Sequence, residues 1–161
     1  MIIKLPYFKQ DTEYSCGPTV MQMVFHFYRK VFSEEELIEK LKTDKDIGTQ
    51  HQAMIDLART EGFYVYVNNG SSLEEIIGLN SKNIPVIVNY IEPDSDEGHY
   101  AVVVDVEEDK IVLNDPWNGE KFKMNLDDFE KRWYGKNGNS KRWIMVISDE
   151  YQPLGKQYLP K

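Results

Sequence analysis

Apolar residues recur at helical spacing near the start of the chain. This pattern predicts a helix over residues 16–30, with Pro18 in its first turn, where a missing N–H costs nothing. The apolar stripe of this helix consists of Val20, Met23, Val24 and Phe27.

Capping-box pairs, in which Ser or Thr is followed three residues later by Glu or Gln, predict where further helices begin. These pairs are Ser33–Glu36, Thr49–Gln52 and Ser72–Glu75. The helix from Thr49 is expected to run to about Glu61, because Gly62 provides a stop signal.

Segments rich in Val and Ile dominate the second half and predict strands. They span residues 84–90, 99–106, 110–114 and 143–147, with one helix over 126–133 and a short earlier strand over 63–67. Helices in the first half and strands in the second indicate an α+β fold. We expect an N-terminal helical half packed on a C-terminal antiparallel sheet, with residues 1–150 as a single domain and 151–161 as a tail.

A length of 161 residues fits one domain. The net charge indicates which classes of partner are unsuitable. Acidic residues outnumber basic ones by 27 to 19, a net charge of −8. This balance argues against nucleic acid, since phosphate binding needs clustered Lys and Arg. No apolar run approaches the roughly 20 residues of a membrane helix, and the N-terminus lacks a signal peptide. We therefore expect no membrane insertion and a cytoplasmic location.

Cys16 is the single cysteine, which excludes an intramolecular disulfide and a thiolate metal cluster. The three histidines share no ligand-like spacing, so no metal and no other cofactor is expected. Cys16 begins the first predicted helix, where the partial positive charge of the N-terminus stabilises a thiolate. Gly17 beside it is expected to let a substrate backbone approach. The alternative is that Cys16 is a small buried apolar side chain.

A thiolate nucleophile needs a base. The position of each of the three histidines in the sequence indicates which of them could serve as the base for Cys16. His26 lies about 15 Å along the same helix from Cys16. His51 is expected to be a solvated residue in the first turn of its helix. His99 begins a strand, and a hairpin that pairs Val103 with Ile111 places it opposite Asp115, at about 5 Å between Cβ atoms.

The carboxylate of Asp115 can then fix the ring tautomer of His99. The alternative role of the Asp115–Pro116 pair is a simple turn. Asp105 is not expected to be the partner, because it lies roughly 20 Å along the strand from His99. Acyl transfer also needs donors for an oxyanion, and the backbone N–H of Cys16 with the side-chain amide of Gln10 could provide them.

Two further features bear on specificity. The acidic run over residues 92–97 is either a solvated loop or an acidic rim that favours basic peptides. Four aromatic residues are candidates for the lining of a cleft beside the cysteine: Tyr14, Tyr90, Tyr100 and Trp117.

In combination, these segments resemble the bacteriocin-processing peptidases, a family of papain-like cysteine peptidases that cleave double-glycine leaders, and their stand-alone members. The residues that carry the resemblance are Gln10, Cys16-Gly17-Pro18, Gly98-His99-Tyr100 and Asn114-Asp115-Pro116. The similarity extends over roughly residues 5–147.

The resemblance implies a papain-like fold and a peptide or protein substrate. It implies Cys16 as nucleophile, His99 as general base and acid, Asp115 as the residue that orients His99, and Gln10 in the oxyanion hole. Two alternatives stay open. The same site can run another acyl transfer, as a transglutaminase or deamidase does, or the chain can be a peptide-binding module without chemistry.

Overall fold

The structure, a computed structural model, describes residues 2–135, 138–155 and 157–161. Its helices are α1 (Cys16–Phe27), α2 (Glu34–Lys40), α3 (His51–Thr60), α4 (Leu73–Ser81) and α5 (Leu126–Arg132). Its strands are β1 (Tyr64–Asn68), β2 (Val86–Ile91), β3 (Gly98–Val106), β4 (Lys110–Asp115), β5 (Gly119–Asn125), β6 (Ile144–Ser148) and β7 (Gln157–Tyr158). Across the described residues, no helix is both long and apolar enough to cross a membrane.

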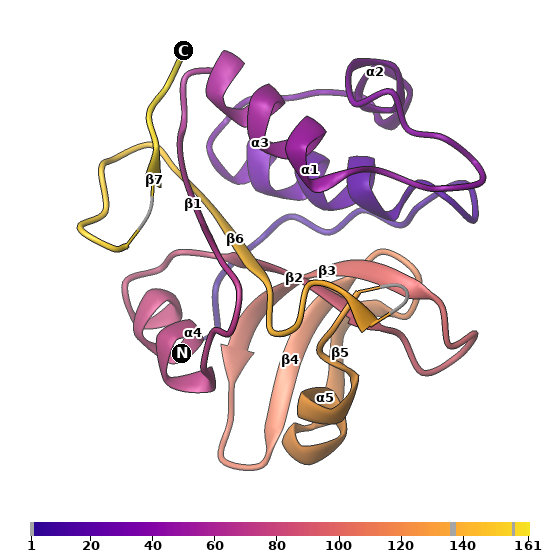
Figure 1. Ribbon diagram of the computed structural model, residues 1–161, viewed down its shortest axis with the longest axis vertical. Helices are drawn as coiled ribbons and strands as arrows, with labels where there is room; N and C mark the ends of the chain where they lie inside the picture. The colour runs from indigo at the N-terminus through magenta and orange to yellow at the C-terminus, as the bar shows by residue number, and fades with distance from the viewer. Residues whose placement is uncertain (1, 136–137, 156) are drawn as a thin grey trace.

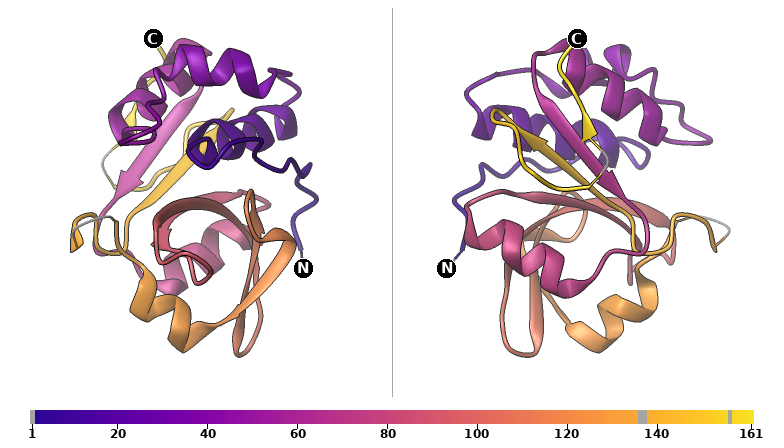
Figure 2. Two further views of the ribbon diagram at one scale, coloured as in Figure 1. Left: turned by 90° about the vertical axis from the view of Figure 1, so that its right-hand side faces the viewer. Right: turned by 60° about the vertical axis from the view of Figure 1, so that its left-hand side comes forward.

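The strands form one sheet in the order β5-β4-β3-β2-β6-β1-β7, and all neighbours run antiparallel. Helices α1, α2 and α3 lie on one side of this sheet, and α4 and α5 lie on the other (Figure 1). The two further views show the same arrangement (Figure 2). The predicted α+β class and the packing of an N-terminal helical half on an antiparallel sheet are confirmed.

Strand β3 shows why the sheet needs a cover on both faces. Successive side chains of a strand point to opposite faces. Tyr100, Val102 and Val104 belong to the core under α1–α3, whereas Ala101 and Val103 belong to the core under α4 and α5. Both sets are buried, so each face of the strand excludes water.

The helix boundaries agree with the sequence in part. Ser33 and Glu36 form the predicted capping box, and the Ser72 side chain accepts from the Glu75 backbone as expected. The first helix ends at Phe27 rather than at residue 30, because Arg29 adopts a left-handed conformation with φ of 67°. Gln50, not Thr49, is the N-cap of α3.

The register of the β3–β4 hairpin differs from the prediction. Val103 pairs with Leu113 rather than Ile111, and the ladder shifts again between Val103 and Asp105. A shift by one residue would have moved every side chain of β4 to the opposite face. The observed shift by two keeps Asp115 on the face of His99, so the contact survives an error in the register.

The sequence analysis did not predict two of the strands, β5 and β7. In β5 only Phe122 and Met124 are apolar, and most of the other residues are charged or polar. Charged residues are common on edge strands, and here they make the strand hard to recognise from the sequence. The two residues of β7 lie in the predicted tail and pair with β1 at the opposite edge of the sheet.

The structure gives a reason for a glycine at position 17 that the sequence analysis did not find. A Cβ atom built on Gly17 would overlap the Thr49 hydroxyl and lie 2.6 Å from the Thr49 Cβ. Thr49 has little freedom to retreat, since its carbonyl accepts from the Tyr100 hydroxyl at 2.8 Å and its hydroxyl contacts that of Thr43 at 2.8 Å. Gly17 therefore lets α1 dock against the loop before α3.

We expect Gly17→Ala to lower the free energy of unfolding by about 1–3 kcal/mol, as overpacking does. Chemical denaturation measures this change. Gly78→Ala is the matched control, because Gly78 lies in α4 with nothing within 4 Å of the added Cβ. That variant should gain about 0.5–1 kcal/mol from helix propensity. Equal stability of the two variants would contradict the docking role of Gly17.

Candidate active site

A cleft of about 720 Å³ opens at the N-terminus of α1. The segment that leads into α1, the loop before α3 and the start of β3 form its walls, and both Cys16 and His99 line it. The other lining residues are Glu13, Tyr14, Lys45, Asp46, Ile47, Gly48, Thr49, Asn89, Glu97, Gly98 and Tyr100. The cleft therefore brings together two of the predicted site residues, which are far apart in the sequence.

Cys16 is the first residue of α1 and is partly buried. The N-cap residue, Ser15, makes no side-chain cap to the helix, although Ser normally fills that role. Pro18 carries no N–H. The uncapped, positive end of the helix thus lies at Cys16, where the sequence predicts that the helix begins.

His99 is the second residue of β3, and only 5% of it is exposed. Its Nε2 lies 2.8 Å from Oδ1 of Asp115. Burial lowers the pKa of His99, but the negative charge of a Cys16 thiolate and hydrogen bonds with Asp115 and Cys16 raise it, and the net shift is upward. Because Asp115 engages Nε2, Nδ1 is the ring nitrogen available to the sulfur.

Asp115 ends β4 and is fully buried. Its Oδ1 accepts from His99 and from the backbone N–H groups of Trp117 and Asn118, both at 2.9 Å, and its Oδ2 accepts from the Tyr90 hydroxyl. Burial raises the pKa of Asp115, but hydrogen bonds from His99, Tyr90 and Asn118 outweigh it and keep the pKa low. A charged carboxylate with this set of donors holds the imidazole in one orientation.

Gln10 lies close to this cluster through the backbone. Its N–H donates to the Pro116 carbonyl at 3.0 Å, directly after Asp115. The side chain is buried, its Nε2 donates to the Thr12 carbonyl at 2.6 Å, and its Oε1 has no partner among the described residues. The structure thus places Gln10 beside the turn that carries Asp115, outside the lining of the cleft.

The other two histidines are structural. His26 packs edge-on against Phe8, consistent with its expected distance from Cys16. The expectation that His51 is solvated is wrong: its ring stacks on Trp143 at 3.9 Å, and burial lowers its pKa. The sequence gives no sign of this, because the stacking partner lies 92 positions further along the chain, in a different half of the fold.

Asn89 is a neighbour of the site that the sequence analysis missed. Its Oδ1 contacts Nε2 of His51 at 3.0 Å, and its Nδ2 donates to the His99 carbonyl at 3.1 Å. Tyr90, the next residue, was also missed as the partner of Asp115. Both lie on the predicted strand over 84–90, but only the pairing of β2 with β3 reveals that they flank His99.

The acidic run before His99 contains one buried carboxylate. Glu92 accepts from the backbone N–H groups of Asp94 and Ser95 at 2.9 and 2.5 Å. Burial raises the pKa of Glu92, but hydrogen bonds from Ser95 and Asp94 lower it overall. Glu92 therefore organises the turn, and it is not part of a solvated loop.

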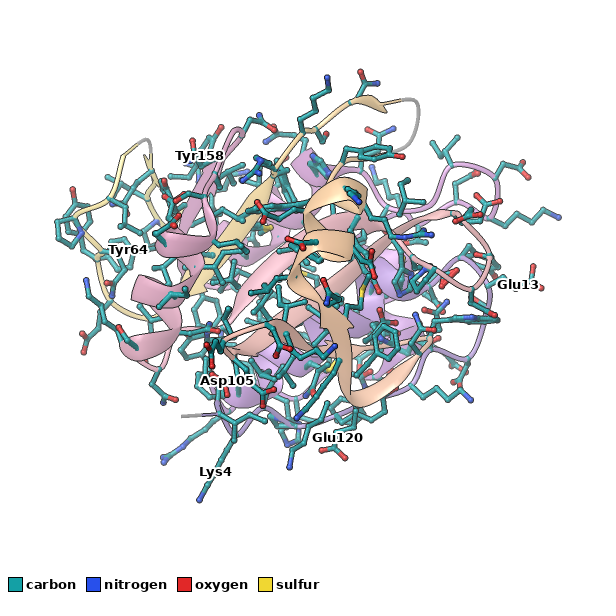
Figure 3. The ribbon with its side chains drawn as sticks, turned by 90° about the horizontal axis from the view of Figure 1, so that it is seen from below. Lys4, Glu13, Tyr64, Asp105, Glu120 and Tyr158 are labelled. Atoms are coloured by element: carbon teal, nitrogen blue, oxygen red, sulfur yellow. The ribbon has the colours of Figure 1, made fainter. Side chains whose placement is uncertain are left out.

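The exposed acids of this run divide into two groups. Asp94 accepts from the Trp117 indole at 3.0 Å and Asp96 pairs with Arg132 at 2.8 Å, so both are engaged away from the cleft. Glu97 lines the cleft with Glu13 and Asp46, and Lys45 is the one lysine of the lining, which contains no arginine among the described residues. Figure 3 shows Glu13 at the outer edge of the molecule, far from Tyr64 and Tyr158 at the opposite end. The rim of the cleft is therefore acidic.

The aromatic candidates are confirmed in part. Tyr14 and Tyr100 line the cleft. Tyr90 is fully buried behind Asp115, and Trp117 is 38% exposed beside Asp94.

Comparisons with known proteins show which family the chain matches. The family model of the Peptidase C39 family matches residues 4–137. An uncharacterized protein of Methanothermobacter marburgensis is 32% identical over 127 residues, which cover 79% of this chain and 82% of that protein.

Solved structures of peptidases share the fold. The peptidase domain of Streptococcus ComA, a bifunctional ABC transporter of a quorum-sensing pathway, is 23% identical, with a TM-score of 0.73 over 92% of this chain and 99% of that one. A double-glycine-motif protease from an AMS/PCAT transporter, in complex with a leader peptide, is 19% identical with a TM-score of 0.72 (91% and 92% covered). A C39-like peptidase from Bacillus anthracis is 14% identical with a TM-score of 0.74 (94% and 98% covered).

The family match spans most of the chain, and the solved structures share its fold. This chain therefore belongs to the peptidase C39 family and is a cysteine peptidase with a papain-like fold.

Proposed function

We propose that the chain hydrolyses peptide bonds through a thioester on Cys16, with His99 as general base and acid, Asp115 as the residue that orients His99, and Gln10 in the oxyanion hole. The observation that carries the proposal is the hydrogen bond between His99 Nε2 and Asp115 Oδ1, which leaves Nδ1 for the sulfur at the cleft. The double-glycine protease among the structural relatives is bound to a leader peptide, which supports a peptide as substrate.

The first half of the reaction forms the acyl-enzyme. The Cys16 thiolate attacks the peptide carbonyl carbon, a C–S bond forms, and the carbonyl electrons move to oxygen. The backbone N–H of Cys16 and the Gln10 amide stabilise this oxyanion, since Nε2 of Gln10 carries two N–H groups and Thr12 takes one of them. The oxyanion then collapses, the C–N bond breaks, and the leaving nitrogen takes the Nδ1 proton of His99.

The second half restores the enzyme. Neutral His99 removes a proton from water as the water oxygen attacks the thioester carbon. The second oxyanion collapses and the C–S bond breaks, which restores the thiolate–imidazolium pair and leaves a carboxylic acid on the peptide. This acid then loses its proton to the solvent and becomes a carboxylate. Throughout the cycle Asp115 stays ionised and keeps the ring aligned. We retain the expected cytoplasmic location as part of this proposal.

Cleavage of a random peptide library, followed by mass spectrometry, tests the reaction. We expect new peptide ends with the wild type and a loss of at least about 10³-fold with Cys16→Ala and with His99→Ala, because both remove a member of one catalytic unit. His26→Ala is the matched control and should keep the activity, since His26 lies outside the cleft.

Two other outcomes would replace the proposal. Ammonia release or amide exchange without chain cleavage would favour a transglutaminase or deamidase. Peptide binding that Cys16→Ala does not alter, together with no turnover, would favour a binding module.

The protonation of His99 provides a second test. Because the net shift of its pKa is upward, the ring should carry both protons at pH 7, and its titration should lie above the ordinary value of about 6.5. In Cys16→Ala the titration should move down, since the thiolate charge is gone. Nitrogen-15 NMR of the imidazole rings measures both.

His51 is the internal control for this titration. Burial lowers its pKa, so its ring should be neutral at pH 7 in both proteins. A neutral His99 at pH 7 in the wild type would argue against a thiolate–imidazolium pair.

The acidic rim leads to a prediction about specificity. We expect Asp46→Asn and Glu97→Gln each to lower kcat/KM for peptides with Lys or Arg by about twofold to fivefold at low salt, which is the range for exposed charge pairs. Neutral peptides should be unaffected. Glu74→Gln, an exposed change on α4, is the control. The same loss for neutral peptides would show that the rim carboxylates act on the fold and not on substrate charge.

A further inference from the structure

Glu34 is a buried carboxylate that the proposed reaction does not use. It is the first residue of α2, yet only 8% of it is exposed. The capping of α2 is done by Ser33 and Glu36, so the Glu34 side chain is not needed as a cap for its own helix. Its oxygens contact a different part of the chain.

The donors to Glu34 come from the segment that leads into α1 and from the first turn of that helix. The Asp11 N–H lies 3.2 and 3.1 Å from the two carboxylate oxygens. The Ser15 hydroxyl donates to Oε2 at 2.9 Å, and the Thr19 hydroxyl lies 3.3 Å from Oε1. One carboxylate thus ties together both flanks of Cys16.

The bond to Ser15 has a consequence for the amides of α1. A Ser at the N-cap normally accepts from an N–H of the first turn. Here the Ser15 hydroxyl donates to Glu34 and accepts from the Thr12 backbone N–H, and it makes no cap. Glu34 therefore keeps this hydroxyl off the Cys16 end of the helix, where N–H groups remain for a developing oxyanion.

The hydrogen bond from the Asp11 N–H to Glu34 affects Gln10, the other proposed donor to the oxyanion. Asp11 directly follows Gln10, whose own N–H is tied to the Pro116 carbonyl at 3.0 Å. The two bonds fix the backbone on both sides of the Gln10 side chain, whose Nε2 is then held beside Thr12. A loose Asp11 would let the Gln10 amide move.

We infer that Glu34 is a positioning residue for the oxyanion hole: it holds residues 10–15 through Asp11 and Ser15, and so fixes the Gln10 amide and leaves the first amides of α1 uncapped. This inference rests on the proposed function, because the hole matters only if an acyl group is transferred. Glu34 acts through Asp11 and Ser15 and, as a carboxylate, is not itself a donor to the oxyanion.

The test compares two reactions of the same sulfur. Acylation by p-nitrophenyl acetate, followed as a burst of p-nitrophenol, passes through an oxyanion. Alkylation by iodoacetamide at pH 6 displaces iodide and needs only the thiolate. We expect Glu34→Ala to slow the burst by about 10²-fold, the cost of losing an oxyanion donor, and to leave alkylation within twofold of the wild type.

Two more variants sharpen the comparison. Glu34→Gln keeps one acceptor oxygen for Asp11 and Ser15, so its burst should slow less than that of Glu34→Ala, about tenfold. Glu35→Ala removes an exposed carboxylate from the same turn of α2 and should change neither reaction. Cys16→Ala gives the background for both reagents.

The outcomes separate the inference from the proposed function. A wild type without a Cys16-dependent burst overturns both. A wild-type burst rate in Glu34→Ala overturns the inference alone, as does an equal loss of burst and alkylation, which would indicate a merely structural role. If Glu34→Ala does not fold, Glu34→Gln decides, and a wild-type burst in that variant overturns the inference.

Discussion

The buried pair of His99 and Asp115 is the constraint that organises the rest of the site. A carboxylate removed from water is costly unless hydrogen bonds replace its hydration. Asp115 meets this requirement with donors from three directions: the His99 ring, the Tyr90 hydroxyl, and the backbone of the turn after β4. The order β4-β3-β2 in the sheet brings these donors together, because the two central strands supply His99 and Tyr90 side by side.

Cys16 reaches this pair from the other layer of the fold. Cys16 sits at the end of a helix whose position depends on Gly17, since no side chain fits between α1 and Thr49. The Thr49 carbonyl is in turn held by the Tyr100 hydroxyl. These contacts of Thr49 therefore fix the position of α1, which carries Cys16, relative to β3, which carries His99.

The sequence predicted the parts of this site that depend on local pattern. The helix start at Cys16 and the alternation of β3 are local, and so the contact between His99 and Asp115 was found in spite of a register error of two residues, which preserves the face. The sequence did not predict the hydrogen bonds of Tyr90, Asn89 and Glu34, or the stacking of His51 on Trp143. Each depends on contacts between different elements of the fold, which no local pattern encodes. Strand β5 was missed because charged residues occupy most of its positions.

Strand alternation explains why one short segment can serve both layers. His99 and Tyr100 are consecutive, so their side chains leave β3 on opposite faces. His99 turns towards Asp115 and Tyr90, whereas Tyr100 turns towards α1 and α3 and holds Thr49. Thr49 packs on Gly17, the neighbour of the sulfur. His99, the proposed general base, and Tyr100, which supports Cys16 through Thr49, are thus adjacent residues of β3. A displacement of β3 would therefore move both sides of the site together.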